Sequence, residues 1–260
     1  IRQPLLPLTV MSRRIRAAGL HLLLSALVAG LVSLLVFQVW FPSPYAAIAG
    51  GLSLFGLLVG VDVILGPALT AVVASPGKGR AELTRDLAFI VIVQLSAFGY
   101  GLYTISLARP VLLAFEVDRL RVVAAADIDP LSLAEAPPGL QSLSWTGPRL
   151  IAAVKPTDPD EQMRSIELGL AGIDLAMQPR QWRDYAARAD EAWRVARPVS
   201  VLLSQYPQLA ADVARIARSA GQPTESLRFL PLMSRQASWV SLIAAPGARV
   251  VGHLPVEGFF

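Results

Sequence analysis

The chain has 260 residues, of which 54% are hydrophobic and 16% charged, so its composition excludes an ordinary soluble domain and favours a membrane protein. The net charge of +4 is confined to residues 1–107, which hold seven Lys/Arg and three Asp/Glu, whereas residues 108–260 hold sixteen of each. Basic residues that flank apolar segments are an orientation signal, so we exclude nucleic acid as a partner. The absence of cysteine excludes disulfides and thiolate metal sites.

The first apolar segment, residues 19–41, contains no formal charge. At about 1.5 Å per residue it is long enough to cross a hydrocarbon core of about 30 Å. Trp40, Phe41 and Tyr45 follow where an interfacial aromatic belt belongs. A cleaved signal peptide is the alternative, but its apolar core is usually about 7 to 15 residues long and a second apolar segment follows here at once. We therefore predict a retained transmembrane helix.

Two further spans follow, at residues 46–74 and 87–107. The second carries Asp62 near its middle and Gly66-Pro67 just after it, and the proline is expected to kink the helix. The third is uncharged and is closed by Arg109-Pro110, a pair that stops a helix.

The loops predict the orientation of the three spans. The topology-determining basic residues are Arg13, Arg14 and Arg16 before the first span, and Lys78, Arg80 and Arg85 between the second and third. The connection at residues 42–44 carries no charge. The positive-inside rule then predicts a cytoplasmic N-terminus and a non-cytoplasmic C-terminal domain, in the periplasm of a bacterium.

This topology divides the chain into three parts. Residues 1–18 form a basic cytoplasmic N-terminus, residues 19–107 a three-helix transmembrane domain, and residues 108–260 a periplasmic domain. Met11 and the basic residues after it are typical of a translation start, so we expect residues 1–10 to be upstream sequence without a function.

The C-terminal domain has the pattern of an α+β fold, with strands first, then helices, then strands. Runs rich in apolar and β-branched residues predict strands at residues 111–117, 120–126, 149–154, 227–233, 237–244 and 249–254. Helices are expected from about residue 159 to 177, from 181 to 196 and from 208 to 220. The predicted fold class is thus a membrane α-helical domain of three spans followed by a periplasmic α+β domain.

Asp62 is the most informative candidate for a functional residue. A carboxylate at mid-bilayer depth costs about 2.5 to 3.5 kcal/mol, so it must face protein or water or be protonated. The functional interpretation is a contact with a partner helix or a proton-linked role. The structural interpretation is a hydrogen bond within the chain, to groups such as Ser53, Thr70, Gln94 or His21.

The sequence contains no recognisable motif for catalysis or for metal binding. His21 and His253 are far apart and no metal-ligand spacing accompanies them, so we expect no metal and no cofactor. Residues 75–80 lack the frame of a phosphate-binding loop, and no nucleophile motif is present in the C-terminal domain, so we expect no catalytic residues and no enzyme. Small residues in the second span, Gly56, Gly60 and Gly66 among them, allow close helix approach.

Several segments resemble the type IV pilin accessory proteins of the TfpX/TfpZ type. The most distinctive is the Gly60–Pro67 core, Gly-Val-Asp-Val-Ile-Leu-Gly-Pro, and the similarity extends over nearly everything from Met11 onward. The segments that carry it are residues 11–24, 58–70, 85–87, 100–103, 108–110, 115–119, 147–149 and 252–256.

This resemblance implies an inner-membrane accessory protein or chaperone that stabilises the major type IV pilin and promotes its assembly into pili. The family brings no catalytic residues with it. A pilin before assembly is an apolar helix in the inner membrane with a globular head outside, so its partner needs a membrane groove and a periplasmic surface. Under this hypothesis the Gly-rich face near Asp62 meets the pilin helix, and the C-terminal domain meets the pilin head. The partner-binding candidates are Asp62, Gly56, Gly60, Gly66 and Pro67, and membrane lipid and the inner-membrane assembly machinery are further partners.

Two alternatives belong to other classes of protein. A membrane-bound enzyme or transporter subunit would use Asp62 and would show a substrate-dependent activity. A ligand sensor would need a cytoplasmic output domain, for which this chain offers only a loop of about a dozen residues between the second and third spans.

Overall fold

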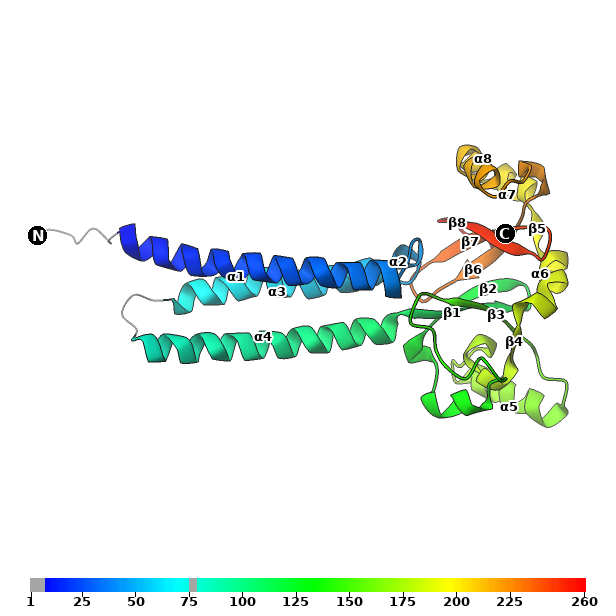
Figure 1. The fold of residues 1–260 in the computed structure, drawn as a ribbon. Coiled ribbons are helices and arrows are strands. Elements are labelled where there is room, and N and C mark those ends of the chain that lie inside the picture. The colour runs from blue at the N-terminus through cyan, green and yellow to red at the C-terminus, as the bar shows by residue number, and fades with distance from the viewer. Residues whose placement is uncertain (1–7, 75–78) are drawn as a thin grey trace, which may run out of the picture. The chain divides into compact units, whose positions relative to one another are not determined.

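The computed structural model describes residues 8–74 and 79–260, and side chains from Ile15 onward. They fall into two compact units. The helical unit comprises the residues up to Val39 together with Gly51–Leu107, and the sheet unit comprises Trp40–Gly50 together with Ala108–Phe260 (Figure 1).

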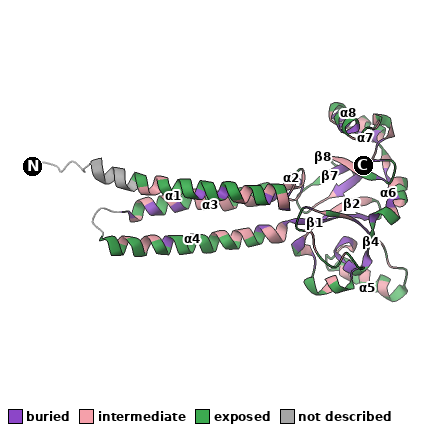
Figure 2. Cartoon of the chain, viewed as in Figure 1, coloured by how far each residue is buried: buried purple, intermediate pink, exposed green. Residues whose placement is uncertain are grey.

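Three long helices form the helical unit. Helix α1 (Leu8–Leu34) continues as a π-helical turn to Trp40, and α3 (Gly51–Val73) and α4 (Arg80–Ala108) follow. Their large apolar side chains mostly face outward (Figure 2), which is the reverse of a soluble helix bundle. All three are long and apolar enough to cross a membrane, at Ile15–Trp40, Gly51–Val73 and Arg80–Ala108. The predicted fold class, three membrane helices followed by an α+β domain, is confirmed.

The second long helix begins at Gly51, later than the expected start at Ala46. Residues Tyr45–Ile48 form the separate short helix α2, which belongs to the sheet unit. Gly50 adopts a positive φ of 75°, a conformation that glycine tolerates and that separates α2 from α3. Helix α4 begins at Arg80 rather than at residue 87, so it includes the charged residues that precede the apolar run. Helix α3 runs through Pro67 to Val73.

Eight strands of the described residues form one mixed sheet, in the order β4-β3-β1-β2-β6-β7-β8, with β5 paired to β6. The strands are β1 (Pro110–Glu116), β2 (Arg119–Ala124), β3 (Arg149–Ala153), β4 (Trp182–Asp184), β5 (Arg197–Pro198), β6 (Arg228–Met233), β7 (Ser238–Ala244) and β8 (Arg249–Leu254). Strands β1 and β2 form an antiparallel hairpin, β1 pairs with β3 and β2 with β6 in parallel, and β6, β7 and β8 form an antiparallel meander. Every residue of the central strand β1 is buried.

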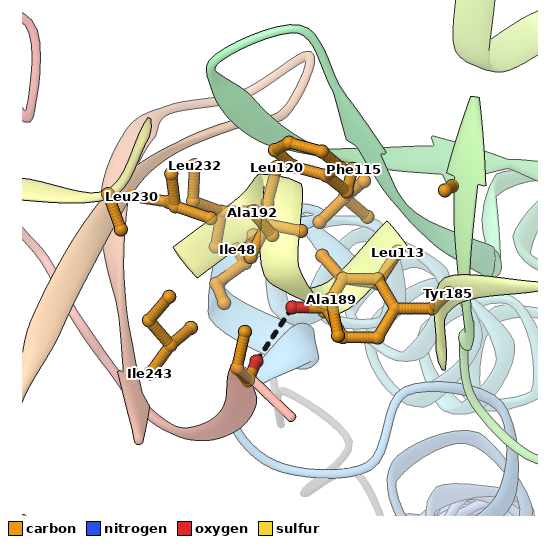
Figure 3. Close-up of a cluster of buried hydrophobic side chains, with 14 residues drawn as sticks. Ile48, Leu113, Phe115, Leu120, Tyr185, Ala189, Ala192, Leu230, Leu232 and Ile243 are labelled. Atoms are coloured by element: carbon orange, nitrogen blue, oxygen red, sulfur yellow. Dashed lines mark hydrogen bonds between the residues drawn. The ribbon is translucent and has the colours of Figure 1, made fainter. Parts of the chain in front are cut away.

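Alternation along the strands divides the core between the two faces of the sheet. In β1, Leu113 and Phe115 join one buried cluster, whereas Leu112 and Ala114 join another. The first cluster is covered by α2 and by α6 (Ala189–Val195), and the Tyr185 hydroxyl within it donates to the Ala248 carbonyl oxygen at 2.6 Å (Figure 3). The opposite face is covered by short 3-10 turns at one end, and by α7 (Val199–Gln205) and α8 (Ala210–Ser219) at the other.

The six expected strands are present, but the helices differ from the prediction. Helix α5 (Pro159–Leu170) begins as expected, with the Asp158 carboxylate accepting from two backbone N–H groups, but it ends well before residue 177. The helix expected at residues 181–196 is wrong over its first half, which forms β4 and a 3-10 turn before α6 begins. Pairing of β4 with β3 and burial of the Trp182 indole, which donates to the Ala176 carbonyl oxygen at 2.9 Å, override the helical pattern there.

The connection between α1 and α3 is built into the core of the sheet unit. Phe41 and Ile48 have no exposed surface, and Ile48 packs in the same cluster as strands β1, β2 and β6. The Ser234 hydroxyl donates to the Ile48 carbonyl oxygen at 2.6 Å. Eleven residues that precede α3 in the chain are therefore part of a domain that otherwise begins at Ala108.

Shortening Ile48 tests this insertion. Because the side chain is fully buried, we expect Ile48→Ala to lower the free energy of unfolding of the sheet unit by about 2 to 5 kcal/mol. Leu131→Ala is the control, since Leu131 is 86% exposed and its loss should change stability by less than about 0.5 kcal/mol. Urea unfolding of the full chain in detergent, followed by tryptophan fluorescence, measures both. Equal midpoints for the two variants would contradict the insertion.

Candidate functional site

The five residues predicted to bind a partner lie on two different faces of α3. Successive residues of an α-helix are about 100° apart, so Gly56, Gly60 and Pro67 share one face. By the same rule Asp62 and Gly66 share a second face, about 120° from the first. One face turns into the helical unit and the other turns outward.

The inward face carries the polar groups of the helical unit. The Gln94 side-chain amide of α4 donates to the Asp62 carboxylate at 3.4 Å. His21 of α1 and Thr70 of α3 are hydrogen-bonded through Nδ1 and Oγ1 at 2.6 Å. Polar side chains in the hydrocarbon region need such partners, because neither lipid nor water satisfies them there. We call His21, Asp62, Thr70 and Gln94 the polar cluster.

Gly66 makes room for the polar cluster. It is buried, and a Cβ atom at this position would lie 2.1 Å from Gln94 Nε2 and 2.9 Å from His21 Nε2. A larger residue would therefore displace the Gln94 and His21 side chains from their present positions. Gly101 of α4 has a similar role against Leu58, whose Cδ1 would lie 2.5 Å from a Cβ atom.

The outward face is open. A Cβ atom on Gly56 or on Gly60 would meet nothing within 4 Å, and the two glycines are four residues apart, the spacing that brings membrane helices into close contact. Pro67 lies on the same face and lines an apolar groove between α1 and α3 with a volume of about 520 Å³. The other lining residues are Ile15, Ala18, Gly19, Leu22, Ala71 and Val72. The face thus combines a smooth backbone strip with a groove.

The basic residues expected to set the topology lie at the same end of the helical unit as far as they are described. Arg16 is exposed on the first turns of α1, and Arg80 and Arg85 are exposed on the first turns of α4, where Arg85 pairs with Asp86 at 3.7 Å. Arg13 and Arg14 are in α1 but their side chains are outside the described set, and Lys78 lies outside the described residues.

Three clusters of polar side chains in the sheet unit can be compared with an active site. The first consists of Ser241, His253 and Tyr45. The Ser241 hydroxyl and His253 Nδ1 are 2.8 Å apart, and the Tyr45 hydroxyl is 3.4 Å from Nε2. Burial lowers the pKa of His253 to about 4 and raises the pKa of Tyr45 to about 12. Ser241 is fully buried, so no substrate reaches its hydroxyl, and the arrangement joins α2 to the β7–β8 hairpin instead.

The other two groups are ion pairs. Arg121 contacts Asp174 and lies 3.7 Å from Glu116, whose second oxygen accepts from the Ala176 N–H at 3.1 Å. Burial raises the pKa of Glu116 although Arg121 opposes this shift. Buried Asp127 pairs with Arg235. Among the described residues no three His, Cys, Asp or Glu side chains gather as a metal site would require.

Comparisons with known proteins identify the relatives of this chain. The family model described as "Fimbrial assembly protein FimB" matches residues 10–50. The chain is 36% identical to the fimbrial assembly protein of serogroup I from Dichelobacter nodosus. The aligned region of 245 residues covers 94% of this chain and 95% of that protein. The chain belongs to the fimbrial assembly protein family.

Two other relatives and the solved structures complete the comparison. The fimbrial assembly protein of serogroup E1 from the same organism is 34% identical over the same shares of the two chains, and that of serogroups C1 and C2 is 46% identical over 44% of this chain and 86% of that protein. No solved structure matches the chain significantly. The resemblance to a type IV pilus assembly family is thereby confirmed.

The sequence alone placed the site of this fimbrial assembly protein only in part. It named the structural partners of Asp62 as a group, and Gln94 is the one that donates to the carboxylate. It predicted Asp62, Gly56, Gly60, Gly66 and Pro67 as partner-binding residues, and the helical geometry divides them between two faces of α3. The sequence contains the signal that separates them: Gly56, Gly60 and Pro67 are spaced by four and seven residues, which keeps them on one helical face, whereas Asp62 is two residues after Gly60 and lies on another.

Substitution of Gly66 tests its role in the polar cluster. A methyl group there must displace Gln94 or His21, so we expect Gly66→Ala to destabilise the helical unit by about 1 to 3 kcal/mol. Gly60→Ala is the matched control, because its methyl group meets nothing and the better helix former should leave stability unchanged or raise it by up to about 1 kcal/mol. Unfolding in sodium dodecyl sulfate measures both, and the account fails if Gly66→Ala is as stable as Gly60→Ala.

Partial burial of His253 makes the stability of the sheet unit depend on pH. The unfolded chain binds a proton at His253 near pH 6.5, and the folded chain only near pH 4, so the unfolded state binds more protons in this window. Stability is therefore highest above pH 6.5 and falls by about 3 kcal/mol as the pH drops toward 4. Urea unfolding across this range, compared with His253→Gln, isolates the contribution. An equal slope in both proteins would contradict it.

Proposed function

We propose that this fimbrial assembly protein binds the major type IV pilin in the bacterial inner membrane and stabilises it before its assembly into a pilus. In this proposal the N-terminus is cytoplasmic and the sheet unit is periplasmic, because the basic residues gather at the other end of the spans. Membership of the family supports a role in pilus assembly, and the relatives are described as fimbrial assembly proteins rather than as enzymes. The protein then acts without chemistry of its own.

The observation that carries the proposal is the open face of α3. An unassembled pilin presents a long apolar helix to the membrane, and such a helix associates by close packing rather than by the hydrophobic effect. Gly56 and Gly60 offer a strip with no side chains, and the groove beside Pro67 continues the same face along the helix. The pilin helix lies along this strip, while its head meets the sheet unit.

Asp62 has a supporting role in this proposal. Its carboxylate faces α4 and holds Gln94, so it fixes the helices that present the open face rather than contacting the pilin. The competing function, an enzyme or transporter subunit that uses Asp62, would require a series of titratable groups. Within the described residues of the helical unit, His21 is the only other titratable side chain in the polar cluster.

Filling the open face tests the proposal. Because a leucine side chain would hold the pilin helix away from α3, we expect Gly56→Leu and Gly60→Leu to reduce the amount of pilin that co-purifies with the full chain about tenfold, equivalent to about 1.4 kcal/mol of packing. Gly99→Leu on α4 is the matched control, since a Cβ atom there also meets nothing within 4 Å.

Two results would contradict this function. Equal pilin recovery with all three variants would exclude the glycine strip as the contact. Loss of self-association of the chain in the Gly56 and Gly60 variants, with pilin recovery unchanged, would show that the strip joins two copies of this protein instead. The folding of each variant is checked by the same detergent unfolding.

A further inference from the structure

The loop Ser144–Gly147 exposes a tryptophan at a defined place on the sheet unit. Trp145 is 60% exposed, the most exposed of the five tryptophans in the chain. The loop follows a long irregular stretch and precedes β3. The core of the sheet unit does not explain this side chain, because most of its surface faces away from the protein.

Arg109 fixes one side of this loop. The Arg109 guanidinium lies over the Trp145 ring, 4.0 Å from its centroid, and the Arg109 Nε–H donates to the Ser144 carbonyl oxygen at 3.3 Å. Arg109 itself is buried, with 6% of its surface exposed, and burial lowers the pKa of its guanidinium. The loop is thus held against the start of β1.

The segment after the first span fixes the other side. The Trp40 and Trp145 rings are 6.4 Å apart. Gly147, with a φ of 80°, brings the loop so close to Pro42 that a Cβ atom would lie 2.6 Å from the proline Cγ. All of these residues belong to the sheet unit, so both contacts are part of its own packing.

These contacts join Trp145 to residues at the ends of two membrane spans. Trp40 is the last residue of the first span, and Arg109 follows directly on Ala108, the last residue of the third. The ends of spans lie in the interfacial layer, where tryptophan is enriched because its indole is apolar over most of its surface and polar at one N–H. We therefore expect a side chain in contact with both Trp40 and Arg109 in the same layer.

We propose that Trp145 inserts into the phospholipid headgroup layer and docks the Ser144–Gly147 loop on the membrane surface. The loop thereby adds a fourth attachment to the three covalent ones, from a segment more than thirty residues beyond the last span. The occupant of this surface is lipid rather than a protein, because the residues that hold Trp145 in place are themselves the ends of membrane spans. The inference does not depend on the proposed binding of pilin.

Quenching by brominated lipids tests the insertion. The full chain is reconstituted in vesicles of phosphatidylethanolamine and phosphatidylglycerol, some of which carry bromine near the headgroup end of the acyl chains. Because Trp40 and Trp145 are the two indoles expected in this layer, Trp145→Phe should lose about half of the quenching seen with the native chain. Trp193→Phe is the matched control: Trp193 also lies under a guanidinium, that of Arg228 at 4.9 Å, but it is on α6 and should keep the full quenching.

Three outcomes would overturn the proposal. The first is equal quenching by bromolipid in the native chain and Trp145→Phe. The second is quenching of Trp145 by aqueous iodide, taken as the difference between the native chain and Trp145→Phe, that is as strong in vesicles as in the urea-unfolded chain, which would place the indole in water. The third is protection from iodide that appears only when pilin is added, which would make Trp145 a contact for the protein partner.

Discussion

Polar side chains inside a block of only three membrane helices are satisfied by one another, and Gly66 is the residue that lets them meet. A carboxylate, an imidazole, a hydroxyl and an amide come from all three long helices and pair across the position where a Cβ atom is missing. Lipid offers these groups no hydrogen bonds, so the pairs resist separation of the helices. These pairs join α1 to α3 and α3 to α4 on the inward face of α3, opposite in role to the outward glycine face.

The sheet unit depends on a second constraint, the placement of the first connection in its core. Because Phe41 and Ile48 are buried there, the chain enters the domain before α3, leaves it, and returns after α4. The unit thus contains two segments of the chain, and more than fifty residues of the helical unit lie between them in the sequence. Tyr45 reaches His253 near the other end of the chain, so this connection packs against a hairpin that is synthesised last.

The sequence predicted what depends on local composition and missed what depends on distant partners. Length and apolarity were sufficient for three spans, and alternation with β-branched residues was sufficient for the longer strands. The apolar residues Ala46–Ile48 suit a membrane span and a protein core equally well, so their composition did not predict that they belong to the sheet unit. Residues 181–188 have a helical composition, but β3 offers backbone partners that composition does not reveal. For α3 the partner-binding residues stay a prediction, and their division between two faces follows from the angle of about 100° between successive residues of a helix.

The central claim is that this fimbrial assembly protein stabilises pilin before assembly, and the most direct measurement is of pilin in cells that lack it. Pilin abundance and surface piliation are compared in the native strain, in a deletion strain and in the deletion strain complemented with the full chain. The account predicts that pilin and surface pili fall together on deletion and return on complementation. Unchanged pilin and pili in the deletion strain would contradict it and leave a three-span membrane protein with another task.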